Sequence, residues 1–289
     1  MHNQKLCIGL SSSFNAPQSE QIKILKKIGF EGCFIDDCRR EAPVEELVKI
    51  AHNYGMDIQS YHAPFNKSDD MWTAGEIGEI ALKEQLECLE ICAKHEIPIM
   101  VTHAFIGYDD DFVNKELGIE RYGKVAKRAN ELGLKFALEN TEGQEYLAIL
   151  MDAFRNEKSV GFCWDTGHEL CYNYSVDMTS LYGDRLICTH INDNLGVSDF
   201  NGVRTYLDDL HLLPFDGITD WRSVARRLAN CGYNDYLTME LSTESKPGRF
   251  NNHKYAEMPF EIFASEAYAR LCRIAALKAQ YEREVDHNG

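Results

Sequence analysis

Apolar runs with β-strand character alternate with segments of helical periodicity about eight times along this chain. Several helical segments end at a glycine, as in SEQIKILKKIG (19–29) and WRSVARRLANCG (221–232), which is typical of helix C-termini. Further helical segments cover residues 43–55, 78–96, 112–133 and 259–285. The strands are predicted near residues 5–11, 32–36, 57–63, 97–103, 135–140, 161–167, 186–193 and 236–242.

Eight βα units predict an α/β fold, a (β/α)8 TIM barrel that occupies residues 1–289 as a single domain. The alternative is a doubly wound open sheet. The GxGxxG fingerprint of such sheets does not follow the first strand, where SSSFNAP stands instead. Barrels commonly reach this length without splitting, and no linker interrupts the pattern. We therefore favour the barrel.

Six of the apolar runs end at a side chain that can bind a metal or transfer a proton. The active site of a parallel barrel lies at the carboxyl ends of its strands, so we expect these side chains at one mouth of the barrel. Strand alternation directs them to the face opposite the helix layer. The six residues are His62, His103, Glu139, Asp165, His190 and Glu240.

The last four strands would bring three carboxylates, Glu139, Asp165 and Glu240, to one point with the imidazole of His190. Three negative charges in a partly desolvated mouth repel strongly, so such carboxylates must protonate or bind a cation. The predicted cofactor is therefore a divalent metal, Mn, Mg, Co or Zn, with added histidines favouring Zn. Candidate ligands for additional metal ions are His62, His103, His168, Asp209 and His211.

The composition of the chain limits the expected binding partners and the expected cellular compartment. The formal net charge of −16 repels phosphate backbones at long range and makes nucleic acid an unexpected partner. Ten cysteines without CxxC pairs read as buried free thiols, which favours a reducing cytosol. No segment has the ~18 apolar residues of a membrane span. We expect a soluble, cytoplasmic protein without membrane contact.

Short strings surround the candidate residues and supply an ordered set of Glu, Asp-x-x-His, His and Glu elements. The strings are SYHAPF (60–65), VTHAF (101–105), LENTEGQ (138–144), CWDTGH (163–168), THINDN (189–194), DLHLLPFDG (209–217) and MELS (239–242). Together they resemble the xylose isomerase-like barrel superfamily, and the resemblance spans most of the chain. That superfamily includes sugar phosphate isomerases and epimerases and the endonuclease IV type of abasic-site nuclease.

The resemblance implies carbohydrate metabolism, with a small sugar or sugar phosphate as substrate. A metal held by the matching residues Glu139, Asp165, His190 and Glu240 would stabilise an enediolate, while Glu139 and Glu240 act as catalytic base and acid. His168 would match a histidine that binds a substrate oxygen. A departure is Gly196, which stands where ketose 3-epimerases carry a substrate-binding Arg. That departure counts against ketohexose 3-epimerisation.

Other residues are candidates for substrate contacts. His62 and His103 lie at the same mouth, and Glu145 has the spacing of a substrate-binding Glu in ketose 3-epimerases. Trp72, on the loop after the third strand, could stack on a sugar face or cap the barrel rim. The final helical segment, residues 259–285, could close the barrel or supply a homo-oligomer contact.

Two other reactions remain open on this scaffold. Endonuclease IV enzymes bind three zinc ions through nine ligands, and each has a plausible match here. The segment APFNKSDDMW after His62 and the string ELCYNYS after His168 both depart from the nuclease pattern. A metal-dependent lyase or dehydratase would share nearly every site residue. The nine residues that match the nuclease ligands are His62, His103, Glu139, Asp165, His168, His190, Asp209, His211 and Glu240.

Overall fold

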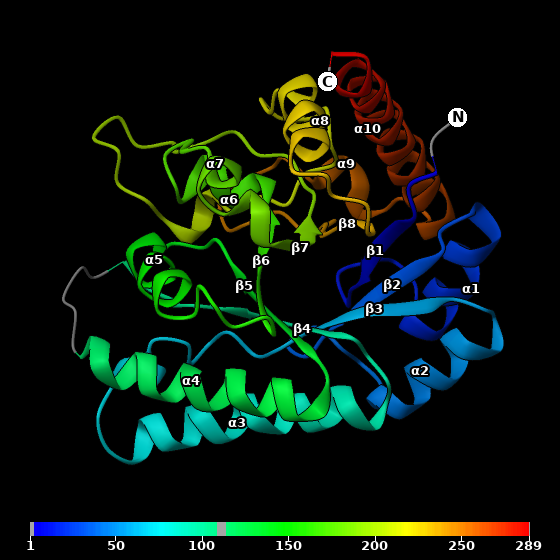
Figure 1. Cartoon of the computed structure of the whole chain (residues 1–289). Helices are drawn as coiled ribbons and strands as arrows, with labels where there is room; N and C mark the ends of the chain where they lie inside the picture. The colour runs from blue at the N-terminus through cyan, green and yellow to red at the C-terminus, as the bar shows by residue number, and fades with distance from the viewer. Residues whose placement is uncertain (1–2, 109–113, 289) are drawn as a thin grey trace.

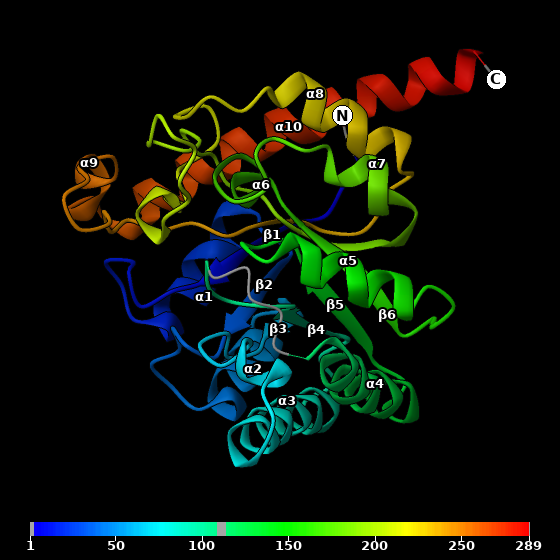
Figure 2. The same cartoon turned by 90° about the vertical axis from the view of Figure 1, so that its left-hand side faces the viewer.

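The computed structural model describes residues 3–108 and 114–288. Eight parallel strands form one sheet in the order β7-β6-β5-β4-β3-β2-β1-β8 (Figures 1 and 2). A parallel bridge from Ile191, just after β7, to Met239 of β8 brings the two edges of the sheet together, so the barrel is nearly closed. The strands are β1 (Leu6–Leu10), β2 (Gly32–Asp36), β3 (Asp57–His62), β4 (Ile99–His103), β5 (Lys135–Glu139), β6 (Val160–Asp165), β7 (Leu186–His190) and β8 (Leu237–Met239).

Helices lie around the outside of the strands, as Figures 1 and 2 show together. The predicted (β/α)8 fold is confirmed, and the doubly wound alternative is excluded because β8 pairs with β1 instead of leaving an open edge. The α-helices are α1 (Gln18–Ile28), α2 (Val44–Asn53), α3 (Glu76–Lys94), α4 (Lys115–Leu132), α5 (Gln144–Ala153), α6 (Thr166–Cys171), α7 (Met178–Tyr182), α8 (Trp221–Asn230), α9 (His253–Ala256) and α10 (Phe260–Asn288). Short 3-10 turns are η1 (Asp70–Trp72), η2 (Gly183–Arg185) and η3 (Tyr206–Asp208).

Alternation along the strands separates an outer and an inner core. On β8, Leu237 and Met239 pack into the large cluster between strands and helices. A second cluster fills the barrel interior and includes Val101, Ala137 and Cys163. These three lie two positions before His103, Glu139 and Asp165 on their strands, so alternation carries those polar side chains to the inner face as well. The order of the sheet then places them around one mouth.

Helix boundaries follow local capping chemistry. The Asn114 side chain accepts a hydrogen bond from Leu117 N at the start of α4, and Gly133 ends that helix in the left-handed conformation. The predicted helix 112–133 thus begins later, at Lys115, and its residues 112–113 lie outside the described residues. The strand predicted over 161–167 ends at Asp165, because the Asp165 side chain caps α6.

The predicted C-terminal helix is α10, which packs against α1 and α8 (Figure 1). It therefore covers the part of the barrel where the first and last strands meet. Of the residues that the structure describes, none belongs to a helix long and apolar enough to cross a membrane.

Candidate metal centre

Five strands end on the polar side chains of the candidate site, and the sixth side chain follows β8 directly. His62, His103, Glu139, Asp165 and His190 are the last residues of β3 to β7. All five are buried, as is Glu240, one residue beyond β8. A parallel sheet aligns the carboxyl ends of its strands, so six segments far apart in the sequence deliver these groups to one mouth.

Four of these residues form a compact cluster. Glu139, Asp165, His190 and Glu240 each offer a ligand atom within 4.8 Å of the others. His190 Nδ1 lies 3.1 Å from Glu139 Oε1 and 3.1 Å from Glu240 Oε2. The sequence therefore predicted the members of the cluster, and the fold brings them together.

Two further groups flank this cluster. His62 Nε2 lies 3.2 Å and His103 Nε2 3.8 Å from Glu139 Oε2. On the other side, Asp209 Oδ1 lies 3.3 Å from His168 Nε2 and 2.9 Å from His211 Nε2. Each of these two sets of three also has its ligand atoms within 4.8 Å of one another. All five residues considered for additional ions thus lie at the candidate site.

Three histidines are oriented through their other ring nitrogen. Nδ1 of His62 lies 2.8 Å from Ala63 O, and Nδ1 of His168 lies 3.1 Å from Asn140 O. Nδ1 of His211 lies 3.3 Å from the carbonyl oxygen of Glu240. A carbonyl can only accept, so Nδ1 carries a proton in each ring. Nε2 points into the site, where it faces a carboxylate in the metal-free protein and would offer its lone pair to a bound metal. Metal-binding histidines are typically held in this way.

Several ligand atoms are buried without hydrogen-bond partners. Within the described part of the chain, these are Nδ1 of His103, Oε1 of Glu139, both ring nitrogens of His190 and Oδ1 of Asp209. Buried polar atoms normally have partners, and each orphan costs roughly 1–3 kcal/mol. His190 Nδ1 therefore lies close to the carboxylate oxygens of Glu139 and Glu240 without forming a hydrogen bond to either. This arrangement, with an oxygen-rich donor set and imidazole nitrogens, fits a divalent cation.

Hydrogen bonds hold Asp165 in place. Its Oδ1 accepts from His168 N at 2.6 Å, and its Oδ2 accepts from Asn192 Nδ2 at 2.7 Å. Its backbone N–H donates to Asn140 Oδ1 at 2.8 Å. The carboxylate orientation is thus set by α6 and by the segment after β7, and lone pairs remain for a ligand.

Burial and mutual contacts shift the pKa values of the carboxylates and imidazoles at this site. Burial raises the pKa of Asp165 to about 6. Burial also disfavours ionised Glu139, but the imidazoles of His190, His168 and His62 together outweigh burial and hold the pKa of Glu139 well below its usual range. Burial lowers the pKa of His62, but the hydrogen bond to Glu139 and the negative charges of Glu139, Asp36 and Glu240 together outweigh burial and raise that pKa to about 9. For His103, burial prevails and lowers the pKa to about 3. Protons on the imidazoles thus provide the positive charge that a cation would bring.

Two candidate substrate residues lie away from the cluster. Trp72 is 1% exposed, its Nε1 donates to Ala104 O at 2.8 Å, and its ring packs against Tyr122 and Tyr146. The ring thus fills the space under the rim and presents no open face to a sugar. Glu145 lies in the first turn of α5, half-buried.

Other residues at the mouth come from loops that strand patterns do not reveal. Lys246 Nζ lies 3.1 Å from Asp209 Oδ2 and joins the long segments after β7 and β8. Arg39 Nε lies 3.2 Å from Asp36 Oδ2, and both line a small cavity together with Glu240. The sequence signal for Lys246 is the length of its connection, residues 243–258 after the eighth predicted strand, because loops of that length are usually functional. For Arg39, the signal was its position just after the second strand.

Comparison with protein-family models shows the family of this chain. A family model described as Xylose isomerase-like TIM barrel matches residues 22–263. The chain belongs to this family. Among curated relatives, an uncharacterised protein y4fM of Sinorhizobium fredii is 32% identical over 53% of this chain and 50% of its own length. A probable endonuclease 4 of Methanocorpusculum labreanum is 28% identical over 42% of this chain and 49% of its own. The chain matches about half the length of each of these relatives.

Solved structures share the fold of this family member at low identity. A D-psicose 3-epimerase from Clostridium cellulolyticum H10, solved with D-tagatose, has a TM-score of 0.70 and 19% identity, covering 95% of this chain and 99% of its own. The IOLI protein with a bound zinc atom has a TM-score of 0.74 and 18% identity, covering 94% and 98%. Such similarity supports the barrel and its strand order.

Proposed function

We propose that this protein is a metal-dependent isomerase or epimerase of a small sugar or sugar phosphate. The observation that carries the proposal is the pair Glu139 and Glu240, whose carboxylates both lie 3.1 Å from His190 Nδ1. The two glutamates come from β5 and from the end of β8, which are separated by β6 and β7. A substrate carbon between them would have a proton acceptor and a proton donor on different sides.

A divalent cation bound by Glu139, Asp165, His190 and Glu240 would polarise a carbonyl oxygen and stabilise the charge that develops on it. One glutamate would remove the proton α to the carbonyl, and the other would return a proton to that carbon or to its neighbour. The first outcome is epimerisation, and the second is aldose–ketose isomerisation. His168, whose Nδ1 lies 3.1 Å from Asn140 O, would bind a substrate oxygen.

The experiment that tests this function begins with elemental analysis of the purified protein. We expect one tightly bound Mn, Mg, Co or Zn ion per chain. The loaded protein is then incubated with a panel of aldoses, ketoses and their phosphates in deuterium oxide, and NMR detects deuterium at the carbon α to the carbonyl. Fully loaded protein that exchanges no proton in any substrate would refute the proposal.

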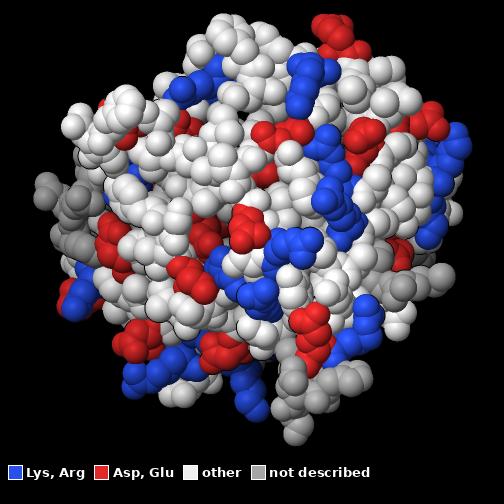
Figure 3. Space-filling view, turned by 90° about the horizontal axis from the view of Figure 1, so that it is seen from above, with Lys and Arg blue, Asp and Glu red and all other residues white. Residues whose placement is uncertain are grey.

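A second candidate, an endonuclease IV-like abasic-site nuclease, is favoured by one observation. The nine matching residues form three adjacent groups around Glu139, which is a member of two of them. Against it, the face that carries α8 and α10 shows basic side chains interspersed with acidic ones (Figure 3), and the chain carries a net charge of −16. About three zinc ions per chain, with cleavage of abasic-site DNA, would put the nuclease first. A lyase would show itself as loss of water from the same sugar panel.

A further inference from the structure

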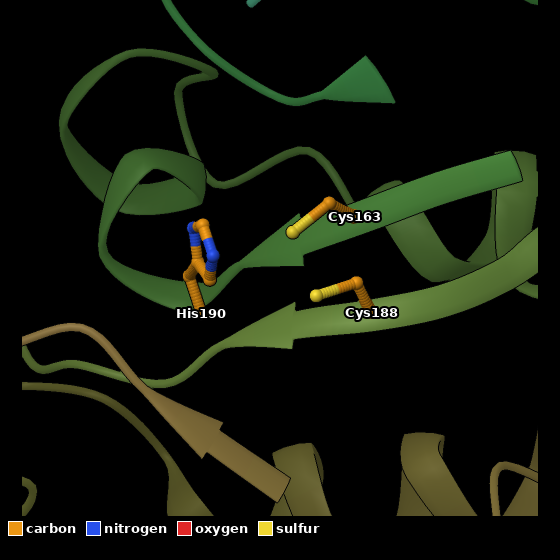
Figure 4. A group of neighbouring side chains, drawn as sticks. All are labelled: Cys163, Cys188 and His190. Carbon is orange, nitrogen blue, oxygen red and sulfur yellow. The ribbon is translucent and has the colours of Figure 1, made fainter. Parts of the chain in front are cut away.

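Beneath the candidate metal centre, two thiols face the far side of the His190 ring. Cys163 and Cys188 are register partners on β6 and β7, and each lies two positions before the polar residue that ends its strand. Figure 4 shows both sulfur atoms pointing toward His190. One ligand atom of each of these three residues lies within 4.8 Å of the other two, and all three side chains are fully buried.

The far nitrogen of His190 differs from that of its neighbours. His62, His168 and His211 each direct their far nitrogen, Nδ1, to a backbone carbonyl. In His190 the nitrogen facing the carboxylates is Nδ1, and Nε2 is a buried atom without a hydrogen-bond partner among the described residues. Nδ1 of His190 also has no hydrogen-bond partner, and the ligand atoms of the candidate metal centre lie around it. Nε2 resembles it in both respects, except that the nearby ligand atoms are the two sulfurs.

We propose that Cys163, Cys188 and His190 Nε2 form a second site that binds a thiophilic d10 cation such as Cu(I), Zn(II) or Cd(II). Two thiolates and one imidazole nitrogen are ligands that such ions prefer, and Mg²⁺ and Mn²⁺ prefer oxygen. On binding, each thiol releases a proton to solvent as its sulfur bonds the ion. In protein without the main cation, the ring proton of His190 stays on Nδ1, which lies 3.1 Å from Glu139 Oε1 and from Glu240 Oε2. When Nδ1 holds the divalent cation of the candidate metal centre, that proton is also released to solvent, and the imidazolate bridges the two ions.

The surroundings suit such an ion. The apolar side chains that pack with the thiols in the inner core include Ile99, Val101 and Ala137, which offer no oxygen ligands. Gln59 approaches from below, with Nε2 3.4 Å and Oε1 3.8 Å from Cys188 Sγ. Its amide oxygen is positioned to become a fourth ligand for an ion that favours tetrahedral geometry.

An entry path exists at the amino end of the barrel. A cavity of about 980 Å³ opens there, opposite the candidate metal centre, and Gln59, Ile99 and Ile187 are among its lining residues. Because the Gln59 side chain contacts Cys188 directly, it stands between this cavity and the thiols. An ion could reach the sulfurs from this side without crossing the mouth that holds the carboxylates.

Cadmium titration of metal-free protein tests the site independently of any enzyme activity. We expect Cd(II) alone to give the ultraviolet charge-transfer band of cadmium–thiolate bonds, saturating at one ion per chain for that band. The double variant Cys163→Ser/Cys188→Ser should lose the band. The matched control Cys88→Ser/Cys92→Ser removes two other buried thiols, both on α3, and should keep it.

A band that survives in Cys163→Ser/Cys188→Ser, or that disappears in the α3 control, would overturn the proposal. If the double variant does not fold by circular dichroism, the singles Cys163→Ser and Cys188→Ser replace it, each expected to weaken cadmium binding at least tenfold. Cadmium-113 NMR of the wild type gives a variant-free check, since a two-sulfur, one-nitrogen site has a resonance distinct from an all-oxygen site. A resonance of all-oxygen type alone would contradict the site.

Discussion

Asn192 donates a hydrogen bond of 2.7 Å from Nδ2 to Oδ2 of Asp165. The contact links the segment after β7 to the end of β6. A Cβ atom built on Gly167 would lie 1.9 Å from Asn192 Oδ1, so only glycine leaves room for this amide. The carboxylate at the centre of the site is therefore oriented by a neighbour that itself depends on a glycine.

Asn192→Ala should weaken binding of the divalent metal by roughly 10–100-fold, the usual effect of removing a group that orients a ligand. Gly167→Ala should act in the same direction because its methyl group displaces Asn192. Isothermal calorimetry with Mn²⁺ or Zn²⁺ measures the change. Asn53→Ala, on the exposed face of α2, is the control and should bind as the wild type does. Unchanged affinity in both test variants would remove Asn192 from this role.

Glu139→Gln and Glu240→Gln should each abolish detectable turnover with the fold intact, because each removes a ligand charge and a proton carrier. Loss of a general acid or base alone costs about 10²–10⁴-fold. Sugar turnover and α-carbon deuterium exchange are the readouts, with circular dichroism for the fold. Glu244→Gln, an exposed change on the loop after β8, should leave turnover unchanged. Activity retained in either Glu139→Gln or Glu240→Gln would rule out the two-glutamate mechanism.

Asp209→Ala and His211→Ala should impair substrate binding or a second metal ion more than the main one. In the structure Asp209 bridges His168 and His211 and lies outside the four-residue cluster. Both variants should therefore retain about one metal ion per chain by elemental analysis. Their Michaelis constant for the sugar substrate should rise. Loss of all bound metal would show instead that the groups act as one coupled cluster.

Metal-free protein should lose stability as pH rises from 6.5 to about 9. Burial lowers the pKa of His62, but the contacts with Glu139 and the charges of Asp36 and Glu240 together raise it from 6.5 to about 9. A raised pKa stabilises the fold below the unfolded value, and that contribution disappears as pH passes the folded value. Bound metal replaces the proton, so the loaded protein should lose less stability over this range. Thermal unfolding with chelator and with saturating metal, at pH 6.5 and 9, compares the two. Equal losses in both states would contradict competition between proton and metal.

Arg121→Leu should destabilise the fold by about 3 kcal/mol, because it leaves buried carbonyl groups without a donor. The buried guanidinium donates to Met71 O at 3.0 Å and to Thr73 O at 2.6 Å. Urea unfolding measures the loss. Arg128→Leu, a change on the outer part of α4, should cost less than about 0.5 kcal/mol. Equal effects of the two substitutions would mean that the contacts of Arg121 add nothing.

The strand-end residues could be predicted from the sequence because the signals are local. Apolar runs ending at Glu139, Asp165 and His190 have strand periodicity, and parallel strands in sequence order place their carboxyl ends together. Strand boundaries agree with the structure to within a few residues. The helical pattern did not predict α5, where apolar residues such as Leu147 and Ile149 do not lie on one narrow face. It also did not predict the short helices α6, α7 and α9, which span only four to six residues.

The sequence by itself determined the barrel, its strand order and the identity of the clustered carboxylates and imidazoles. Only the tertiary structure decided which nitrogen of each histidine faces the site, the enclosure of Trp72 and the approach of Lys246 to Asp209. It also placed two thiols behind His190. Periodicity depends on residues within one strand or helix, and these features depend on side chains from different segments that meet only when the barrel closes.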